Sequence, residues 1–153
     1  MLSQTTEYAL RIVVYLASLD GKPATISQIA AATQTPQGYL AKVLRNLALA
    51  ELVRSQRGLG GGSVLARPAK SISVLDVVQA VDPIRRITKC PLNIKSHAAN
   101  LCPLHRRLDD AIAMVEKAFA RSSIAELAPE RTGEQPFRDP SRAGRARNLT
   151  VLR

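Results

Sequence analysis

Both cysteines and both histidines of the chain fall within sixteen positions. They are Cys90, His97, Cys102 and His105. Thiolate and imidazole groups bind zinc, iron and iron–sulfur clusters, so the grouping predicts a site for a cluster or for a single zinc or iron ion. The spacing lacks the close Cys-x-x-Cys pair of most zinc folds. Two alternatives therefore stay open: a thiol pair that responds to oxidation, and a connector without special chemistry.

The sequence that follows Cys102 predicts a long helix beside this site. From Pro103 onwards, apolar residues recur at spacings of three and four: Leu104, Leu108, Ala111, Ile112, Val115 and Phe119. A helix over 103–127 would be roughly 38 Å long, which is too long for one small domain to cover. We therefore expect a dimerisation helix that packs on a second copy of the chain. Its N-terminus would favour the thiolate form of Cys102.

The N-terminal part of the chain predicts short helices with clear boundaries. A first helix over about 6–19 ends before Gly21. Thr25 opens a second helix, and Gln28, three residues later, completes a capping box. A break at 33–34 then separates the second helix from a third.

The third helix has the pattern of a recognition helix. Thr35 is expected to cap it, and Pro36 to occupy its first position. Apolar residues at helical spacing leave a polar, basic outer face made of Gln37, Tyr39, Lys42, Arg45 and Asn46. Two short helices joined by a tight turn, the second with such a face, predict a helix-turn-helix. The alternative is an ordinary amphipathic helix with a solvated polar face.

A β-hairpin follows the third helix directly. Two strand-like runs flank a glycine-rich turn over 58–62, which predicts a wing whose backbone can approach DNA. Arginines on the hairpin are candidate DNA contacts, although they could be solvated strand charges. The candidate DNA-binding residues of the two motifs are Thr35, Gln37, Tyr39, Lys42, Arg45, Arg54, Arg57, Gly60 and Gly61. Ser73 and Asp76 then open a fourth helix that runs to about Val81.

Composition favours duplex DNA as the partner. The net charge of +10 suits a polyanion, and only three Tyr, two Phe and no Trp are present to stack single-stranded bases. No apolar run is long enough to span a bilayer, and the N-terminus lacks the order of a secretory signal, so we expect a cytoplasmic protein.

The chain divides into four parts. A winged helix-turn-helix domain occupies 1–82, a sensor or connecting loop 83–102, a dimerisation helix 103–128 and a basic tail 129–153, which we expect to be disordered. The fold class is mainly α, with three helices plus a β-hairpin wing and a long C-terminal dimerisation helix.

Four segments of the sequence resemble the Rrf family of winged-helix transcriptional regulators. They are Thr6–Arg11, Ser27–Ala30, Arg57–Gly62 and Val74–Val78. The resemblance covers residues 1 to about 127. It implies that the long helix forms a dimer, that the recognition helix enters the major groove through Gln37, Tyr39 and Lys42, and that the wing reaches the minor groove through Arg57.

The resemblance also implies a cluster-binding loop. Family members often hold an iron–sulfur cluster on three cysteines of this loop, sometimes with a following histidine and an acidic residue from the partner subunit. Cys90 and Cys102 match the outer cysteines, His105 matches the histidine, and Glu7 is similar in position to the acidic residue. The chain departs from the pattern at the middle cysteine, near Ser96, where His97 stands beside the expected position.

These observations predict a homodimeric, sequence-specific DNA-binding regulator, a repressor, rather than an enzyme. The loop over 90–105 would respond to redox, nitric oxide or metal status. No nucleophile with a base and an orienting group is recognisable, which argues against catalysis. Two alternatives remain: a winged-helix protein–protein adaptor that does not bind DNA, and a regulator with a metal-free thiol switch.

Overall fold

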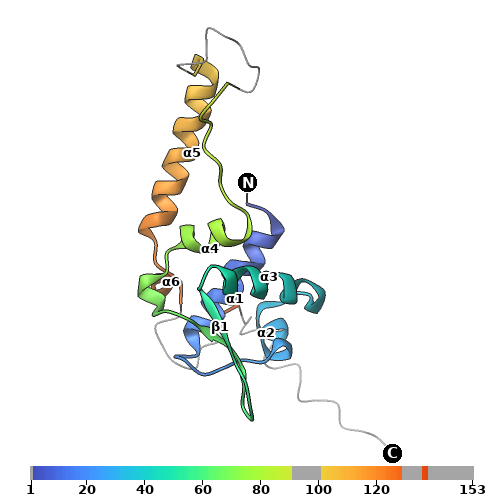
Figure 1. Ribbon diagram of the computed structural model, residues 1–153. Helices are drawn as coiled ribbons and strands as arrows, with labels where there is room; N and C mark the ends of the chain where they lie inside the picture. The colour runs from blue at the N-terminus through green and yellow to red at the C-terminus, as the bar shows by residue number, and fades with distance from the viewer. Residues whose placement is uncertain (1, 91–100, 129–135, 138–153) are drawn as a thin grey trace, which may run out of the picture.

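Helices α1 to α4 and a β-hairpin form the body of the molecule, and α5 extends from it as an arm (Figure 1). The computed structural model describes residues 2–90, 101–128 and 136–137. The elements are α1 (Gln4–Ser18), α2 (Ile26–Thr33), α3 (Gln37–Leu49), β1 (Val53–Gln56), β2 (Gly62–Leu65), the 3-10 turn η1 (Ala69–Ser71), α4 (Val74–Val81), α5 (Pro103–Arg121) and α6 (Ile124–Leu127).

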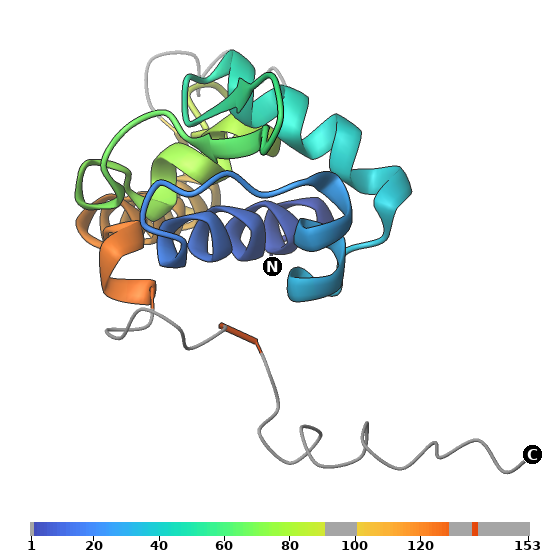
Figure 2. The ribbon, with the colours of Figure 1, turned by 90° about the horizontal axis from the view of Figure 1, so that it is seen from below.

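The starts of α1 and α2 are set by side-chain caps. The backbone N–H of Thr6 donates to Oγ of Ser3 at 3.3 Å, so α1 begins slightly earlier than predicted. The predicted capping box of α2 is confirmed, because Thr25 and Gln28 each bond to the other's backbone N–H. Seen from below, α2 and α6 lie at opposite ends of α1 (Figure 2).

The predicted cap of α3 is wrong. No side chain bonds to the first turn of α3, and Pro36 is the N-cap residue before the helix rather than its predicted first residue. Thr35 is buried instead, and its hydroxyl pairs with the hydroxyl of Thr33 at 2.9 Å. The left-handed backbone of Gln34 (φ 53°) ends α2 and brings the two threonines together inside the turn.

The core lies where α1, α3 and α4 meet. Each of these helices is apolar on one face, and those faces are removed from water together. The fully buried side chains include Ile12, Val13, Ile29, Leu40, Val43, Leu47, Leu52, Ile72, Val77 and Val78.

The predicted hairpin is confirmed, and the loop before α2 pairs with the first residues of β2. Strands β1 and β2 pair antiparallel from Val53 opposite Leu65 to Gln56 opposite Gly62. Ala24 joins the ladder, donating to the Ser63 carbonyl at 3.0 Å and accepting from the Ser63 N–H at 2.8 Å. The backbone of Ala24 lies so close to Gly62 that a Cβ there would sit 2.4 Å from the Ala24 carbonyl oxygen.

The expected continuous helix over 103–127 is wrong. Helix α5 ends at Arg121, so its 19 residues span about 28 Å. The extended Ser122 accepts a hydrogen bond from the Val74 N–H at 2.9 Å, and Ile124 donates to the Ile72 carbonyl at 2.8 Å. A capping box at Ser123 then opens α6. The chain leaves the helical path because this short β-bridge buries Ile124 in the core.

Helix α4 connects the body to the arm. Its start at Ser73, with Asp76 completing a capping box, and its end at Asp82 confirm the predicted fourth helix. Residues 83–90 then run back along α5 towards its N-terminal end (Figure 1). Within the described ranges, no helix combines the length and apolar character needed to cross a bilayer. The predicted disordered tail lies almost wholly outside the described residues.

Candidate DNA-binding face and regulatory site

The outer face of α3 carries the predicted polar and basic side chains. Gln37, Lys42 and Arg45 are exposed, and Tyr39 is 47% exposed. Thr35 does not belong to this face, because its buried hydroxyl is already paired with Thr33. The remaining four residues are exposed and can offer hydrogen bonds and positive charge to a duplex groove.

The wing presents its arginines and its turn to solvent. Arg54 on β1 and Arg57 after it are exposed, as is Gly60 at the turn, with a left-handed φ of 78°. Gly61 is half-buried, and a Cβ at that position would lie 2.5 Å from the Gln56 carbonyl oxygen. The turn is therefore compact, and its backbone can approach a phosphate or a groove edge closely.

A ring contact between α1 and α3 was not apparent from the sequence. The rings of Tyr8 and Tyr39 lie 5.6 Å apart between centroids, with their planes inclined at 60°. Tyr8 is 8% exposed, and its hydroxyl accepts a hydrogen bond from Nε2 of Gln4 at 2.9 Å. The four-residue spacing of Gln4 and Tyr8 suits a helical pair, but no local pattern indicates the partner 31 positions away.

The helix-turn-helix is also tied to α1 through an arginine. Arg11 forms an ion pair with Glu7 at 2.9 Å, and its NH1 donates to the Thr33 carbonyl at 3.4 Å. The first contact could be expected from the four-residue spacing on one helix face, whereas the second depends on how α2 folds back. Glu7, the predicted ligand from a partner subunit, is thus linked to the turn before α3.

The candidate metal-binding residues are only partly brought together. Sγ of Cys102 lies 3.2 Å from Nδ1 of His105, across the first turn of α5. Cys90 is buried on the connector, and both cysteines are thiols. His97 lies outside the described residues. Among the residues that the structure describes, no three His, Cys, Asp or Glu side chains are grouped closely enough to hold one metal ion.

The connector is fastened to α5 by an aspartate. Oδ1 of Asp109 accepts hydrogen bonds from Nε of Arg86 at 2.7 Å and from the backbone N–H of Ile87 at 2.8 Å. Arg86 also pairs with Glu116 at 3.5 Å. The hydrogen bond from Arg86 holds the pKa of the Asp109 carboxyl below its usual value, and the Ile87 N–H acts in the same direction. These contacts fix the chain just before Cys90 against the helix that begins after Cys102.

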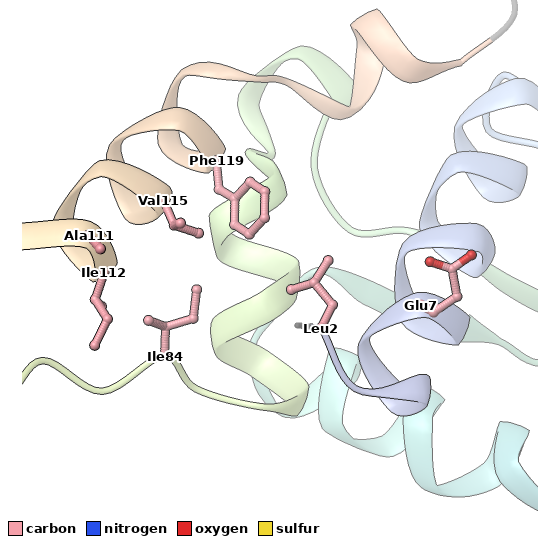
Figure 3. Close-up of a pocket in the computed structure, with 7 residues that line it drawn as sticks. All are labelled: Leu2, Glu7, Ile84, Ala111, Ile112, Val115 and Phe119. Atoms are coloured by element: carbon pink, nitrogen blue, oxygen red, sulfur yellow. The ribbon is translucent and has the colours of Figure 1, made fainter. Parts of the chain in front are cut away.

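An apolar groove separates the arm from the N-terminus of α1. Its volume is about 720 Å³. Figure 3 shows its lining: Leu2 and Glu7 from the N-terminal region, Ile84 from the connector, and Ala111, Ile112, Val115 and Phe119 from α5. Phe119 packs against the core, but Leu104, Leu108 and Val115 are 63%, 47% and 43% exposed. The apolar stripe of α5 is therefore left largely open, and only Ile112 and Phe119 of the stripe are half-buried.

A helix-turn-helix followed by a hairpin wing and a long C-terminal helix defines the winged-helix class of DNA-binding transcriptional regulators. A family model described as "Rrf2: Iron-dependent Transcriptional regulator" matches residues 2–130. The chain belongs to this Rrf2 family, which confirms the resemblance seen in the sequence, and it is a transcriptional regulator.

Solved structures share the fold over most of the chain. The global cysteine regulator CymR (YrzC) of B. subtilis is similar with a TM-score of 0.69 and 24% identity, covering 84% of this chain and 95% of that one. IscR of T. potens is similar with a TM-score of 0.68 and 21% identity, covering 83% of this chain and 85% of that one. CymR of Staphylococcus aureus is similar with a TM-score of 0.62 and 27% identity, covering 84% of this chain and 98% of that one.

Among the described residues, too few donors are brought together to hold a cluster. An iron–sulfur cluster is held by several protein ligands, mostly thiolates, and the described residues bring together only Cys102 and His105. The chain holds two cysteines in all, without the middle cysteine of the loop. The chemistry available at this point is that of one thiol beside one imidazole.

Proposed function

We propose that the chain is a sequence-specific operator-binding repressor that acts as a homodimer. The observation that carries this proposal is the exposed face of α3, with Gln37, Tyr39, Lys42 and Arg45, next to a wing with an exposed Arg57. A second copy would cover the part of the α5 stripe that the single chain leaves open. Two recognition helices related by two-fold symmetry would then address half-sites about one helical turn apart.

The second part of the proposal is that Cys102 and His105 receive a redox or metal signal. The support is their 3.2 Å contact at the start of α5. The thiolate is the form of a cysteine that binds metals and reacts with oxidants, and a neighbouring imidazole can serve as a second metal ligand. A disulfide with Cys90 would form by loss of two electrons and two protons to an oxidant such as a peroxide.

Two sets of contacts support a path from this site to the DNA-binding face. Asp109 ties the connector to α5, so a change around residues 90–102 is transmitted to the arm. Arg11 is shared between Glu7 and the Thr33 carbonyl. If Glu7 binds a metal held by the partner subunit, its carboxylate pairs less strongly with Arg11. The turn before α3, which Arg11 also contacts, would then change. Couplings of this kind usually amount to about 1–3 kcal/mol.

DNA binding is tested with duplexes selected from a random-sequence library by the full-length protein. We expect an enriched palindrome whose affinity falls steeply as salt increases, because Lys and Arg release counterions from phosphates. The variant Lys42→Ala should weaken binding to it. An adaptor that does not bind DNA would enrich no sequence.

Sensing is tested on anaerobically purified protein by metal analysis, native mass spectrometry and DNA affinity. Metal that is lost in both Cys102→Ser and His105→Ala supports coordination. A metal-free protein whose affinity responds to peroxide, and no longer does so in either Cys90→Ser or Cys102→Ser, supports the thiol switch. An affinity that ignores metal, chelator, nitric oxide and oxidant alike would show that residues 90–105 are only a connector.

A further inference from the structure

We infer that Tyr8, a buried residue of α1, positions Tyr39 on the DNA-binding face and thereby sets base discrimination by α3. This inference rests on the proposed DNA-binding function. The carrying observation is the ring contact between the two side chains, at 5.6 Å between centroids and inclined at 60°. One ring belongs to the core side of the body and the other is 47% exposed on the outer face.

Tyr8 is suited to act as a fixed support. It is 8% exposed, and its hydroxyl accepts a hydrogen bond from Gln4 at 2.9 Å. Its neighbours on the same helix, Ala9 and Ile12, are fully buried. The ring is therefore largely removed from solvent, and its hydroxyl is held by Gln4.

Without the ring contact to Tyr8, the exposed side chain of Tyr39 could adopt several rotamers. It lies in the first turn of α3, the part of a recognition helix that reaches base edges. An inclined pair of aromatic rings is attractive, and the fixed ring of Tyr8 favours the Tyr39 rotamers that maintain this contact. The ordering of Tyr39 is then achieved within the fold, before DNA binds, which improves both affinity and selectivity.

A merely structural role for Tyr8 makes a different prediction. If the ring contact only stabilised the body, replacing Tyr8 would lower affinity for all duplexes alike, in proportion to the loss of folded protein. If Tyr8 positions Tyr39, the loss falls on the base pairs that Tyr39 reads and requires the Tyr39 ring to be present. Tyr15 provides a matched control, because it is also a buried tyrosine of α1, at 7% exposure.

The experiment uses the full chain and a duplex enriched from a random-sequence library, together with a panel of its single base-pair substitutions. Dissociation constants are measured for the unmutated protein, Tyr8→Leu, Tyr39→Ala, the double variant and Tyr15→Leu. We expect Tyr8→Leu to weaken binding about two- to tenfold and to lose discrimination at the same base pairs as Tyr39→Ala. The double variant should bind no more weakly than Tyr39→Ala, and Tyr15→Leu should keep the discrimination.

The inference is overturned if Tyr8→Leu weakens duplex binding by the same factor with and without the Tyr39 ring. It is also overturned if Tyr15→Leu loses the same base discrimination. Neither result contradicts the proposed DNA binding. If Tyr8→Leu does not fold, Tyr8→Phe keeps the ring and removes only its bond to Gln4. A loss of about twofold is then expected at the same base pairs, absent in the Tyr39→Ala background, and an identical loss in both backgrounds overturns the inference. Failure of the unmutated protein to select any duplex overturns the proposed function and this inference together.

Discussion

Replacing Val115 with aspartate is expected to dissociate the proposed dimer without unfolding the chain. Val115 lines the apolar groove and is 43% exposed in the single chain. Full burial of a valine side chain contributes about 1.5–3 kcal/mol, so covering the remaining surface contributes about 1 kcal/mol per copy. A two-fold dimer contains the residue twice, which gives about 2 kcal/mol of lost apolar burial.

The introduced charges add to this loss. Two carboxylates placed in an apolar seam cost several kcal/mol more, unless the seam opens. The dimer should therefore weaken by at least about 4 kcal/mol, which is about a thousandfold in the dissociation constant. Sedimentation velocity across the micromolar range measures this change, and circular dichroism checks that the helical content is preserved.

Met114→Asp is the matched control for this experiment. Met114 is the preceding residue on α5, is 66% exposed and does not line the groove. The same charge at this position should leave the dimer largely intact. The reasoning is refuted if the unmutated protein is monomeric at micromolar concentration, or if Met114→Asp dissociates it as strongly as Val115→Asp.

Three further predictions concern the wing, the connector and the contact between β2 and the loop before α2. Arg57→Ala should weaken operator binding mainly at an A·T-rich minor-groove position, measured by competition with substituted duplexes, and unchanged binding to every duplex would remove the wing assignment. Because the folded-state pKa of Asp109 is lowered, its contacts contribute stability above the unfolded value of about 3.9 and lose it as pH falls through the folded value. The amide resonance of Ile87 should therefore keep its position down to about pH 4 and shift below it, whereas in Asp109→Asn it should start from a shifted position and show no such step. Gly62→Ala should lower the melting temperature by several degrees, since its Cβ would lie 2.4 Å from the Ala24 carbonyl oxygen, and an unchanged melting temperature would mean that the loop yields freely.

The helices and the hairpin could be predicted because their signals are local. The capping box of Thr25 and Gln28 marks the start of α2, and the glycine-rich turn between two strand-like runs marks the wing. The inward and outward faces of α3 follow from helical periodicity alone. Where two local signals competed, the sequence was harder to interpret. Thr35 has the residue type of a cap. The left-handed backbone of Gln34 instead places it inside the turn, where its hydroxyl pairs with the hydroxyl of Thr33.

The end of α5 was missed even though a signal was present. Ser123 with Glu126 three residues later is a capping box, and it starts a new helix inside an apolar pattern that otherwise continues. The contacts of the candidate site are different, because they join residues far apart in sequence. Arg86 and Asp109 are 23 positions apart and Arg11 and Thr33 are 22 apart, so only the folded chain reveals them.

The β-bridge between Ser73 and Ser123 has a consequence for the modular construction of the molecule. The chain leaves the body at the end of α4 and returns beside its start, so the whole excursion over 83–121 is inserted between the two ends of one eight-residue helix. Those ends are about 12 Å apart, a distance that a linker of about four to six residues can span. An exchange of the arm would therefore leave the β-bridge and α6 in place, but it would remove Ile84 and Phe119 from the core that they pack against.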